Sequence, residues 1–471
     1  MPSVTEEFCA AMLGAARGPL EPAVARATGR SLLNVLGPAV SAAGSDAVRV
    51  LLAVADEAAS AGNTSAGQAT VPGLARTLDP YWAALVTGTA AHLDDFDDTH
   101  LATVIHPGAS ALGAVLSLVP ETTPSGAAFL GAFAVGCEAQ LRIGCAISPA
   151  HYDHGWHITG TCGVFGAAVA ACALLHLDAQ ATARALSLAA TMTAGHREAF
   201  GTMTKPLHAG KAAANGVLAA RLAAAGLGGP ADPLGAGGVL EVLAASVDRD
   251  ALGLGWPAGH RWELELNTFK SYPCGVVAHP AMDAAIIASA RISELAGRAE
   301  ISDVRLRCNP LVPELMGLEQ PDDGLRSRFS ARHGVAVGLL YGRAGLAEFS
   351  DATATAPEVA RLRSLITLDV DPAVARDAAV LRVSLRPAPG REPGVEWPAI
   401  EAPGIEVTVE HSRGSVSRPL TDDDLLDKVR ALFGPVLGER AADRARDAIG
   451  KLPGAEDTSA LLAAIRPEAS Q

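Results

Sequence analysis

The chain has 471 residues, and its 37 Lys and Arg against 51 Asp and Glu give a formal net charge of −14 at pH 7. Hydrophobic residues make up 49% of it and charged residues 19%, which excludes a disordered protein. The acidic balance and the lack of any Lys/Arg run argue against nucleic-acid binding as its main role.

Seven scattered cysteines without a Cys-x-x-Cys pair indicate reduced thiols rather than a disulfide framework or a zinc site. The N-terminal segment carries Glu6 and Glu7 and has no basic stretch, so we expect no signal peptide. The most apolar run, from Cys162 to Leu175, is too short to cross a bilayer. We therefore expect a soluble, cytoplasmic protein that does not bind membranes.

Helical periodicity dominates the chain up to about residue 265. It predicts helices at residues 3–16, 46–61, 81–98, 107–118, 124–146, 158–176, 179–195, 206–225 and 236–247. Gly and Pro residues separate these segments.

Beyond residue 265 the pattern becomes mixed. It predicts a helix at 281–298, strands at 301–308 and 379–386, and a hairpin of 405–410 with 414–418 around Ser412-Arg413-Gly414, before helical periodicity returns from Asp422. We expect a mainly α protein with a smaller α+β domain. The large helical domain comprises residues 1–265 and is completed by 419–471, and the α+β domain comprises 266–418.

The segment from His92 to His100 contains four carboxylates within five positions, at the end of a predicted helix. On a helix, Asp95 and Thr99 share one face, as do Asp94 and Asp98. Carboxylates so close repel, so one of them needs a raised pKa or a cationic partner. A solvated acidic helix end is one alternative. A magnesium site, as in terpene and prenyl-diphosphate synthases, is another, although a second acidic motif and a basic cluster for a diphosphate are missing from the sequence.

Four cationic or imidazole side chains stand at predicted helix entrances: His106, His157, Lys205 and Lys270. Each alone has an ordinary interpretation as a turn, a polar loop or a solvated lysine. A helix N-terminus favours anions and a neutral imidazole. If these entrances converge, they form a pocket for a small di- or tricarboxylate that needs no metal, with Asp95 and Thr99 supplying hydrogen bonds.

Three histidines at spacing three, ending at His157, raise the possibility of a metal site. Gly155 and the lack of a helix before it argue against ligand geometry there.

Five motifs carry a family resemblance: HLDDFDDTH, HPG, GWHITGTCGVFGAAVAA, REAFGTMTKPLHAGKAAANG and KSYPCGVVAHPAMDA. In this order they resemble the MmgE/PrpD family, which includes 2-methylcitrate dehydratase, cis-aconitate decarboxylase and iminodisuccinate epimerase. The resemblance implies a large all-helical domain built from both chain ends, an α+β lid domain, a homodimer and an active site between the domains. The family's active-site pattern falls on Asp95, Thr99, His106, His157, Lys205 and Lys270.

Two departures from the decarboxylase pattern are visible. The tyrosine that the decarboxylase uses in its lid is absent, its position falling near Met316, and the segment between Thr99 and His106 is one residue longer. Both speak against cis-aconitate decarboxylation itself.

The resemblance therefore predicts a cofactor-free lyase that transfers protons at the carbon next to a carboxylate, most similar to a 2-methylcitrate dehydratase. The two lysines would bind substrate carboxylates, the two histidines would act as acid and base, Asp95 would orient a cation and Thr99 would donate to a substrate oxygen. A decarboxylase or an epimerase on the same scaffold, a magnesium-dependent diphosphate lyase and a non-catalytic scaffold are the alternatives.

Overall fold

A computed structural model describes residues 2–60, 68–256, 261–295, 299–387 and 404–468. The chain forms two compact units, one of Met1–Phe269 with Leu420–Gln471 and one of Lys270–Pro419. The first is mainly helical and the second combines helices with a sheet, so the expected fold class is confirmed.

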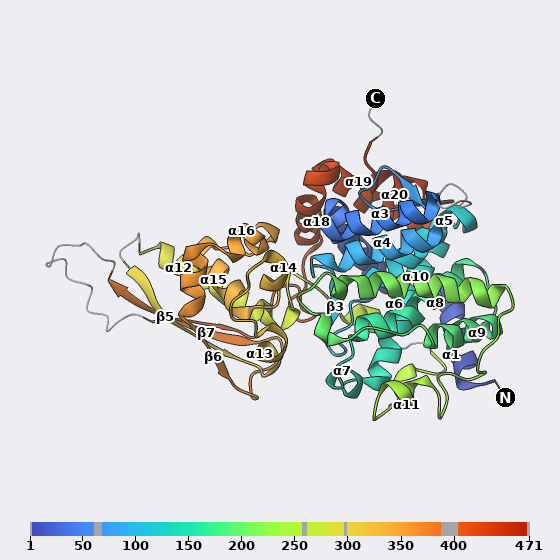
Figure 1. Ribbon diagram of the computed structural model, residues 1–471, viewed down its shortest axis with the longest axis horizontal. Coiled ribbons are helices and arrows are strands. Elements are labelled where there is room, and N and C mark those ends of the chain that lie inside the picture. The colour runs from blue at the N-terminus through green and yellow to red at the C-terminus, as the bar shows by residue number, and fades with distance from the viewer. Residues whose placement is uncertain (1, 61–67, 257–260, 296–298, 388–403, 469–471) are drawn as a thin grey trace. The chain divides into compact units, whose positions relative to one another are not determined.

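The first unit is a bundle of helices to which both ends of the chain contribute (Figure 1). Its helices are α1 (Val4–Arg17), α2 (Pro22–Ser41), α3 (Asp46–Ser60), α4 (Pro80–Leu93), α5 (Pro107–Thr122), α6 (Gly126–Ile147), α7 (Ala150–Asp153), α8 (Ile158–Leu174), α9 (Ala179–Ala190), α10 (Thr204–Ala224), α11 (Val239–Leu243), α18 (Asp422–Leu437), α19 (Glu439–Lys451) and α20 (Ser459–Ala464). Two short antiparallel strand pairs accompany them: β1 (Ala69–Thr70) with β2 (Thr77–Leu78), and β3 (Asp98–His100) with β4 (Asn267–Phe269).

The centre of this unit is built from helices that approach closely through small residues. Every residue of α8 is buried, and α10 packs along both α8 and α4. At the crossing of α4 and α10, a Cβ on Gly88 would lie 2.8 Å from the Cα of Gly210, and a Cβ on Gly210 would lie 2.2 Å from the carbonyl oxygen of Leu85. Only glycines allow this approach, which brings the first turn of α10 next to the end of α4.

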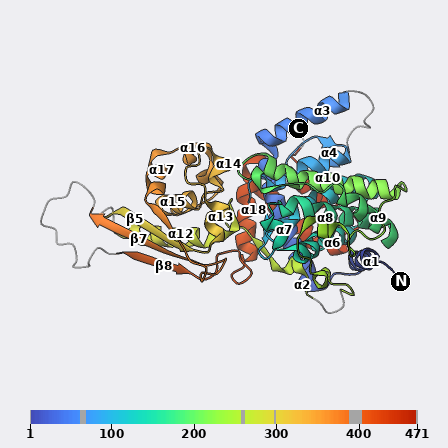
Figure 2. The same ribbon diagram turned by 60° about the horizontal axis from the view of Figure 1, so that its bottom comes forward.

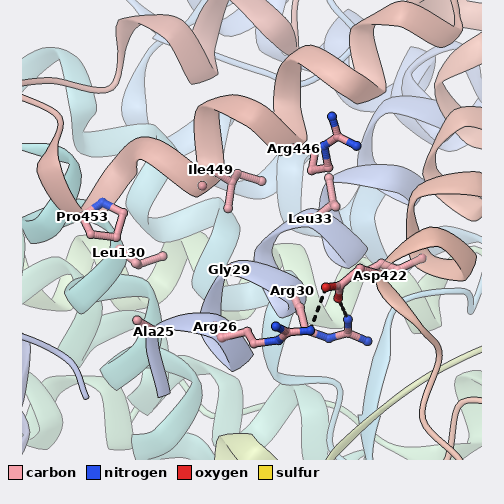
Figure 3. A pocket seen from close by; sticks show the side chains of 12 residues that line it. Ala25, Arg26, Gly29, Arg30, Leu33, Leu130, Asp422, Arg446, Ile449 and Pro453 are labelled. Carbon is pink, nitrogen blue, oxygen red and sulfur yellow. Dashed lines mark hydrogen bonds and ion pairs between the residues drawn. The ribbon is translucent and has the colours of Figure 1, made fainter. Parts of the chain in front are cut away.

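The C-terminal segment packs on the N-terminal one: α18 lies against α2. A cavity of about 300 Å³ lies between α2 and the C-terminal helices. Figure 3 shows its lining side chains, which include the apolar Leu33 and Ile449. Arg26 and Arg30 on its rim both pair with Asp422. None of the expected site residues lines this cavity.

Helix α6 is long and apolar enough to cross a membrane, but 94% of its most apolar window is buried inside the protein. The bent pair formed by α2 and α3 passes the same test of length and composition. A core helix of a globular protein meets this test as well.

The sequence-based elements need three corrections in this unit. The helix expected at 81–98 ends at Leu93, and Asp98 to His100 form a strand, so Asp95 and Thr99 do not share a helix face. Helix α2 was not expected. Helix α10 begins at Thr204, so Lys205 lies inside its first turn rather than before the helix.

The second unit holds a four-stranded sheet with the order β6-β5-β7-β8, in which only the β5–β6 pair is parallel. Its strands are β5 (Ala299–Cys308), β6 (Ile366–Val370), β7 (Ala379–Pro387) and β8 (Ile405–Val409), and its helices are α12 (His279–Ser293), α13 (Leu311–Met316), α14 (Gly324–Ser327), α15 (Ala331–Tyr341), α16 (Asp351–Ala354) and α17 (Pro357–Ser364).

One face of this sheet is apolar and is covered by α12, which lies against β7 and β8 (Figure 2). Leu306, Leu381 and Val407 stand opposite one another in the register and are all buried. Helix α15 packs on α12 and extends the same core.

This unit differs from the sequence-based expectation in two places. Strand β6 was not expected, and residues 414–418 form turns instead of the second strand of a hairpin. Gly414 has a φ of +89°, and the backbone N–H of Arg413 donates to the carboxylate of Asp283, so this segment is held as a compact turn.

Candidate functional site

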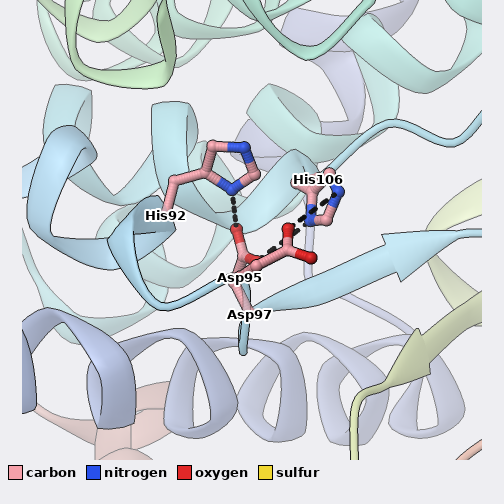
Figure 4. A group of neighbouring side chains, drawn as sticks. All are labelled: His92, Asp95, Asp97 and His106. Atoms are coloured by element: carbon pink, nitrogen blue, oxygen red, sulfur yellow. Dashed lines mark hydrogen bonds and ion pairs between the residues drawn. The ribbon is translucent and has the colours of Figure 1, made fainter. Parts of the chain in front are cut away.

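The site forms where α4 ends and where α5, α8 and α10 begin. After Leu93 the chain turns at Asp95, whose φ is +49°, a left-handed conformation that Asp adopts more readily than most residues. The turn directs the next residues into β3. It brings Asp95 and Asp97 next to His92 and His106, as Figure 4 shows.

Asp97 is shared between two imidazoles. One carboxylate oxygen lies 2.8 Å from Nδ1 of His92 and the other lies 3.0 Å from Nδ1 of His106. Burial opposes ionisation of Asp97, but the two imidazoles outweigh it and hold its pKa well below the usual value. A carboxylate accepts from both Nδ1–H groups, so both rings present Nε2 with its lone pair when they are neutral. Thr99 Oγ1 lies 3.3 Å from Nδ1 of His106, at the same edge of that ring.

Lys205 forms a buried ion pair with Asp95. Its ammonium comes from the first turn of α10, and the side chains of Lys205 and Asp95 are 7% and 4% exposed. The ammonium also lies 5.5 Å from the ring centroid of Phe200, and Nε2 of His106 is 3.9 Å from the same carboxylate oxygen of Asp95. A cation is therefore fixed beside the imidazoles.

His157 precedes the first residue of α8, as His106 precedes that of α5. Its ring stacks on His92 at a centroid distance of 5.6 Å, and its Nδ1 lies 3.0 Å from Nδ1 of His208. Burial, reinforced by neighbouring imidazoles and Lys205, holds the pKa of His157 well below its usual value. Burial likewise lowers the pKa of His208 to about 4. Both imidazoles are therefore neutral near pH 7, the state in which a histidine can accept a proton.

Four of these side chains have the chemistry of metal ligands. The donor atoms of His92, Asp95, Asp97 and His106 lie within 4.8 Å of one another. However, the ammonium of Lys205 already binds Asp95, and both oxygens of Asp97 accept from imidazoles. A metal ion here would have to displace that ammonium, so the group fits an ion-paired network better than a cation site.

The acidic segment does not present its carboxylates together as a diphosphate-binding motif would require. Asp98 accepts hydrogen bonds from Ser31 Oγ at 2.8 Å, from the backbone N–H of Gly108 at 3.1 Å and from Asn267 Nδ2 at 3.0 Å. It therefore ties β3 to α2, α5 and β4, and the magnesium alternative loses one of its expected ligands.

The structure brings five of the six residues expected from the sequence into one network: Asp95, Thr99, His106, His157 and Lys205. Lys270 is the first residue of the second unit and follows Phe269, which pairs with Asp98 in the β3–β4 pair. Lys270 does not stand at a helix entrance: the next helical segment is the 3-10 helix Val276–Ala278, which leads into α12 at His279. The roles of all six residues stay predictions.

Three members of the network were missed: His92, Asp97 and His208. His92 and Asp97 belong to the acidic motif. They were missed because a helix was expected over residues 81–98, whereas α4 ends at Leu93 and the turn that follows brings the two side chains together. His208 is three residues after Lys205 on α10, so helical spacing alone places it on the same face as the lysine.

Comparison with known proteins defines the class. Two family models match the chain: the MmgE/PrpD N-terminal domain model matches residues 6–249, within the first unit, and the MmgE/PrpD C-terminal domain model matches residues 272–453, which include nearly all of the second unit and the returning helices α18 and α19 of the first. The chain belongs to the MmgE/PrpD family and is an enzyme of that family.

Several curated relatives carry the same name. A cis-aconitate decarboxylase of Mus musculus is 27% identical over 98% of this chain and 93% of its own length. One of Homo sapiens is 29% identical over 79% of this chain and 77% of its own. One of Aspergillus terreus is 27% identical over 84% of this chain and 83% of its own.

Proposed function

We propose that this enzyme is a metal-independent lyase that acts on a small di- or tricarboxylate and moves a proton at the carbon next to a carboxylate. The observation that carries the proposal is the buried group of neutral imidazoles beside the ammonium of Lys205. A neutral histidine serves as acid or base near pH 7, and a buried ammonium suits a carboxylate ligand. The name of the relatives above supports a tricarboxylate of the aconitate type.

In the proposed mechanism Lys205 and Lys270 bind substrate carboxylates and stabilise the enolate-like charge that develops when the carbon loses its proton. His106 and His157 form the acid/base pair, one acting on the carbon-bound proton and the other on the leaving group. The carboxylate of Asp97 stabilises the imidazolium that forms on His106, as the aspartate of a catalytic triad does. Thr99 donates to a substrate oxygen.

The leaving group decides the reaction, and we favour loss of water, as in a 2-methylcitrate dehydratase. Met316, near the position of the decarboxylase tyrosine, ends α13 and is only 1% exposed within the core of the second unit. A methionine cannot supply the hydroxyl group that the decarboxylase tyrosine provides. Decarboxylation is the second candidate, favoured by the name of the relatives, and epimerisation results if the proton returns on the opposite face.

Proton NMR in deuterated water with 2-methylcitrate, cis-aconitate and iminodisuccinate tests the proposal. Dehydration creates new vinylic or methyl signals, and decarboxylation releases carbon dioxide. Epimerisation incorporates deuterium while the carbon skeleton of the substrate stays unchanged. A preceding thermal-shift screen of di- and tricarboxylates selects substrates, since a ligand at a hundred times its Kd stabilises by about 2.7 kcal/mol.

The proposal is wrong if no di- or tricarboxylate is turned over or exchanges deuterium. It is also wrong if a chelator abolishes turnover and added Mg²⁺ restores it, which would return the magnesium-dependent diphosphate lyase to consideration.

A further inference from the structure

A second cluster of ligand-type side chains lies outside the network described above. It consists of His100 at the end of β3, Cys145 on α6 and Glu263 at the start of the short 3-10 helix Glu263–Leu266. All three belong to the first unit, and their donor atoms lie within 4.8 Å of one another. Nε2 of His100 is 3.2 Å from Oε2 of Glu263, and Sγ of Cys145 is 3.8 Å from the same oxygen.

The imidazole of His100 is aimed at this cluster. Its Nδ1 is held by Thr103 Oγ1 at 3.0 Å, which leaves Nε2 to face Glu263. His100 is 1% exposed, and within the described residues its Nε2 makes no hydrogen bond of acceptable geometry. The nitrogen faces the Glu263 carboxylate as an ion pair, so a metal ion bound between the two groups would replace that contact.

The backbone of Glu263 is fixed by hydrogen bonds to a buried carboxylate. The buried carboxylate of Glu138 accepts the backbone N–H of Glu263 at 3.1 Å and that of Leu264 at 3.0 Å. Arg142 donates to Glu138 at 2.7 Å and balances its charge. In metal sites, hydrogen bonds to the ligating residues, like these and like the one between Thr103 and His100, orient the ligand atoms.

The spacing fits a tetrahedral ion. Zinc bonds of about 2.0 Å to nitrogen or oxygen and 2.3 Å to sulfur place neighbouring ligand atoms about 3.3–3.7 Å apart. The two distances to Glu263, 3.2 Å from His100 and 3.8 Å from Cys145, lie just outside the two ends of that range, so small side-chain shifts bring the three atoms into place. A carboxylate and a thiolate together also neutralise a divalent cation.

We propose that His100, Cys145 and Glu263 bind one divalent transition-metal ion of the zinc class, with its fourth coordination position open to solvent. Glu263 lines a cavity of about 510 Å³ together with Arg142, Arg249 and Arg261, so a water or a small anion can reach that position. On binding, the thiol proton of Cys145 is released to solvent and its sulfur bonds to the metal as a thiolate, without any change of oxidation state.

The ion would tie β3 to α6 and to the chain before β4. Because Thr99 precedes His100 in β3 and contacts His106, the site would stabilise the strand that carries part of the catalytic network. It is a structural or regulatory site, and it does not rest on the proposed lyase activity.

Titration of the full-length, chelator-stripped enzyme with Co²⁺ tests the site. We expect one Co²⁺ per chain, with visible bands of a tetrahedral ion and a near-ultraviolet thiolate-to-metal band. Zn²⁺ should displace it and raise the Tm. Cys145→Ser should remove the thiolate band and weaken binding by more than the about 10- to 100-fold that loss of a residue hydrogen-bonded to a metal ligand causes, and Glu263→Gln should weaken it too.

Two matched variants separate the alternatives. Cys308→Ser removes another buried thiol, in the second unit, and should leave the titration unchanged. Asp97→Asn should also leave it unchanged, whereas loss of binding in Asp97→Asn but not in Cys145→Ser would place the ion in the imidazole network and overturn the proposal. Absence of Co²⁺ or Zn²⁺ binding by a folded wild-type enzyme would show that the cluster is a hydrogen-bonded thiol, carboxylate and imidazole. Turnover by the metal-free enzyme bears only on the lyase proposal.

Discussion

At the scale of single residues, the site is governed by how buried charges are balanced. Asp95 and Asp97 are ionised inside the protein because each faces a positive or proton-donating partner: Lys205 for the first and two imidazoles for the second. The same burial lowers the pKa values of His92 and His157 and keeps these two imidazoles neutral near pH 7. Acid/base chemistry near pH 7 depends on both conditions at once.

Replacement of Lys205 by Met should lower kcat/KM by on the order of a hundredfold or more, because it removes a charge contact to the substrate in the transition state. Lys451→Met, at an exposed position of α19, is the control and should have no effect.

Lys205→Met also removes the ammonium that balances the buried charge of Asp95, which costs about 3–5 kcal/mol of stability. The double variant Asp95→Asn/Lys205→Met should regain most of that stability, measured by urea unfolding, and stay inactive. Recovery of activity along with stability would make Lys205 a purely structural residue.

His208 should make the protein sensitive to mild acid. Its pKa in the folded state is about 4, lowered by burial and by His196, His92, Lys211 and Lys205, against about 6.5 when unfolded. Between these values the unfolded chain binds more protons than the folded one, so the free energy of unfolding falls as pH drops from about 6.5 to about 4, by up to about 1.4 kcal/mol per pH unit for this group.

Urea unfolding at several pH values measures how the free energy of unfolding changes with pH. His208→Asn should make this slope shallower, whereas His154→Asn, at an exposed histidine, should not. An unchanged slope in His208→Asn would mean that His208 does not contribute to acid sensitivity.

At the scale of elements, the site depends on how closely α10 approaches α4. Helix α10 supplies Lys205 and His208, and the turn after α4 supplies Asp95 and Asp97, so the crossing at Gly88 and Gly210 sets the distance between the two sides. The β3–β4 pair then fixes the path of the chain after the turn.

Gly210→Ala should destabilise the protein by about 1–3 kcal/mol, the usual effect of overpacking, because its Cβ would lie 2.2 Å from both Leu85 O and Thr89 Oγ1. Gly14→Ala, in the middle of α1 with nothing within 4 Å of the new Cβ, should instead stabilise it by about 0.5–1 kcal/mol. Thermal unfolding compares the two variants. Equal shifts in Tm for the two variants would mean that the close crossing of α4 and α10 does not limit the size of the residue at position 210.

At the scale of the whole molecule, the two units differ in how the chain builds them. The second is one continuous segment with its own core, whereas the first needs both chain ends, since α18 packs on α2. The homodimer and the cytoplasmic location expected from the sequence stay predictions.

A segment of residues 270–419 should therefore fold alone, whereas a chain that ends at residue 419 should lose the fold of its first unit, because the apolar face of α2 is left uncovered. Circular dichroism and cooperative unfolding of the two fragments measure this. A cooperatively folded first unit without residues 420–471 would contradict it.

The sequence by itself determined the helical character of most segments, the strands near 301–308 and 379–386, and the entrances at His106 and His157, because these depend on local periodicity and on Pro or capping preferences. The family motifs directed attention to five side chains that the structure gathers. Only the tertiary structure decided that α4 ends at Leu93, that Asp97 joins two imidazoles, and that His100, Cys145 and Glu263 meet. These depend on contacts between distant segments, such as Asp98 with Ser31 and Asn267, which outweigh the local preference of the acidic segment for a helix.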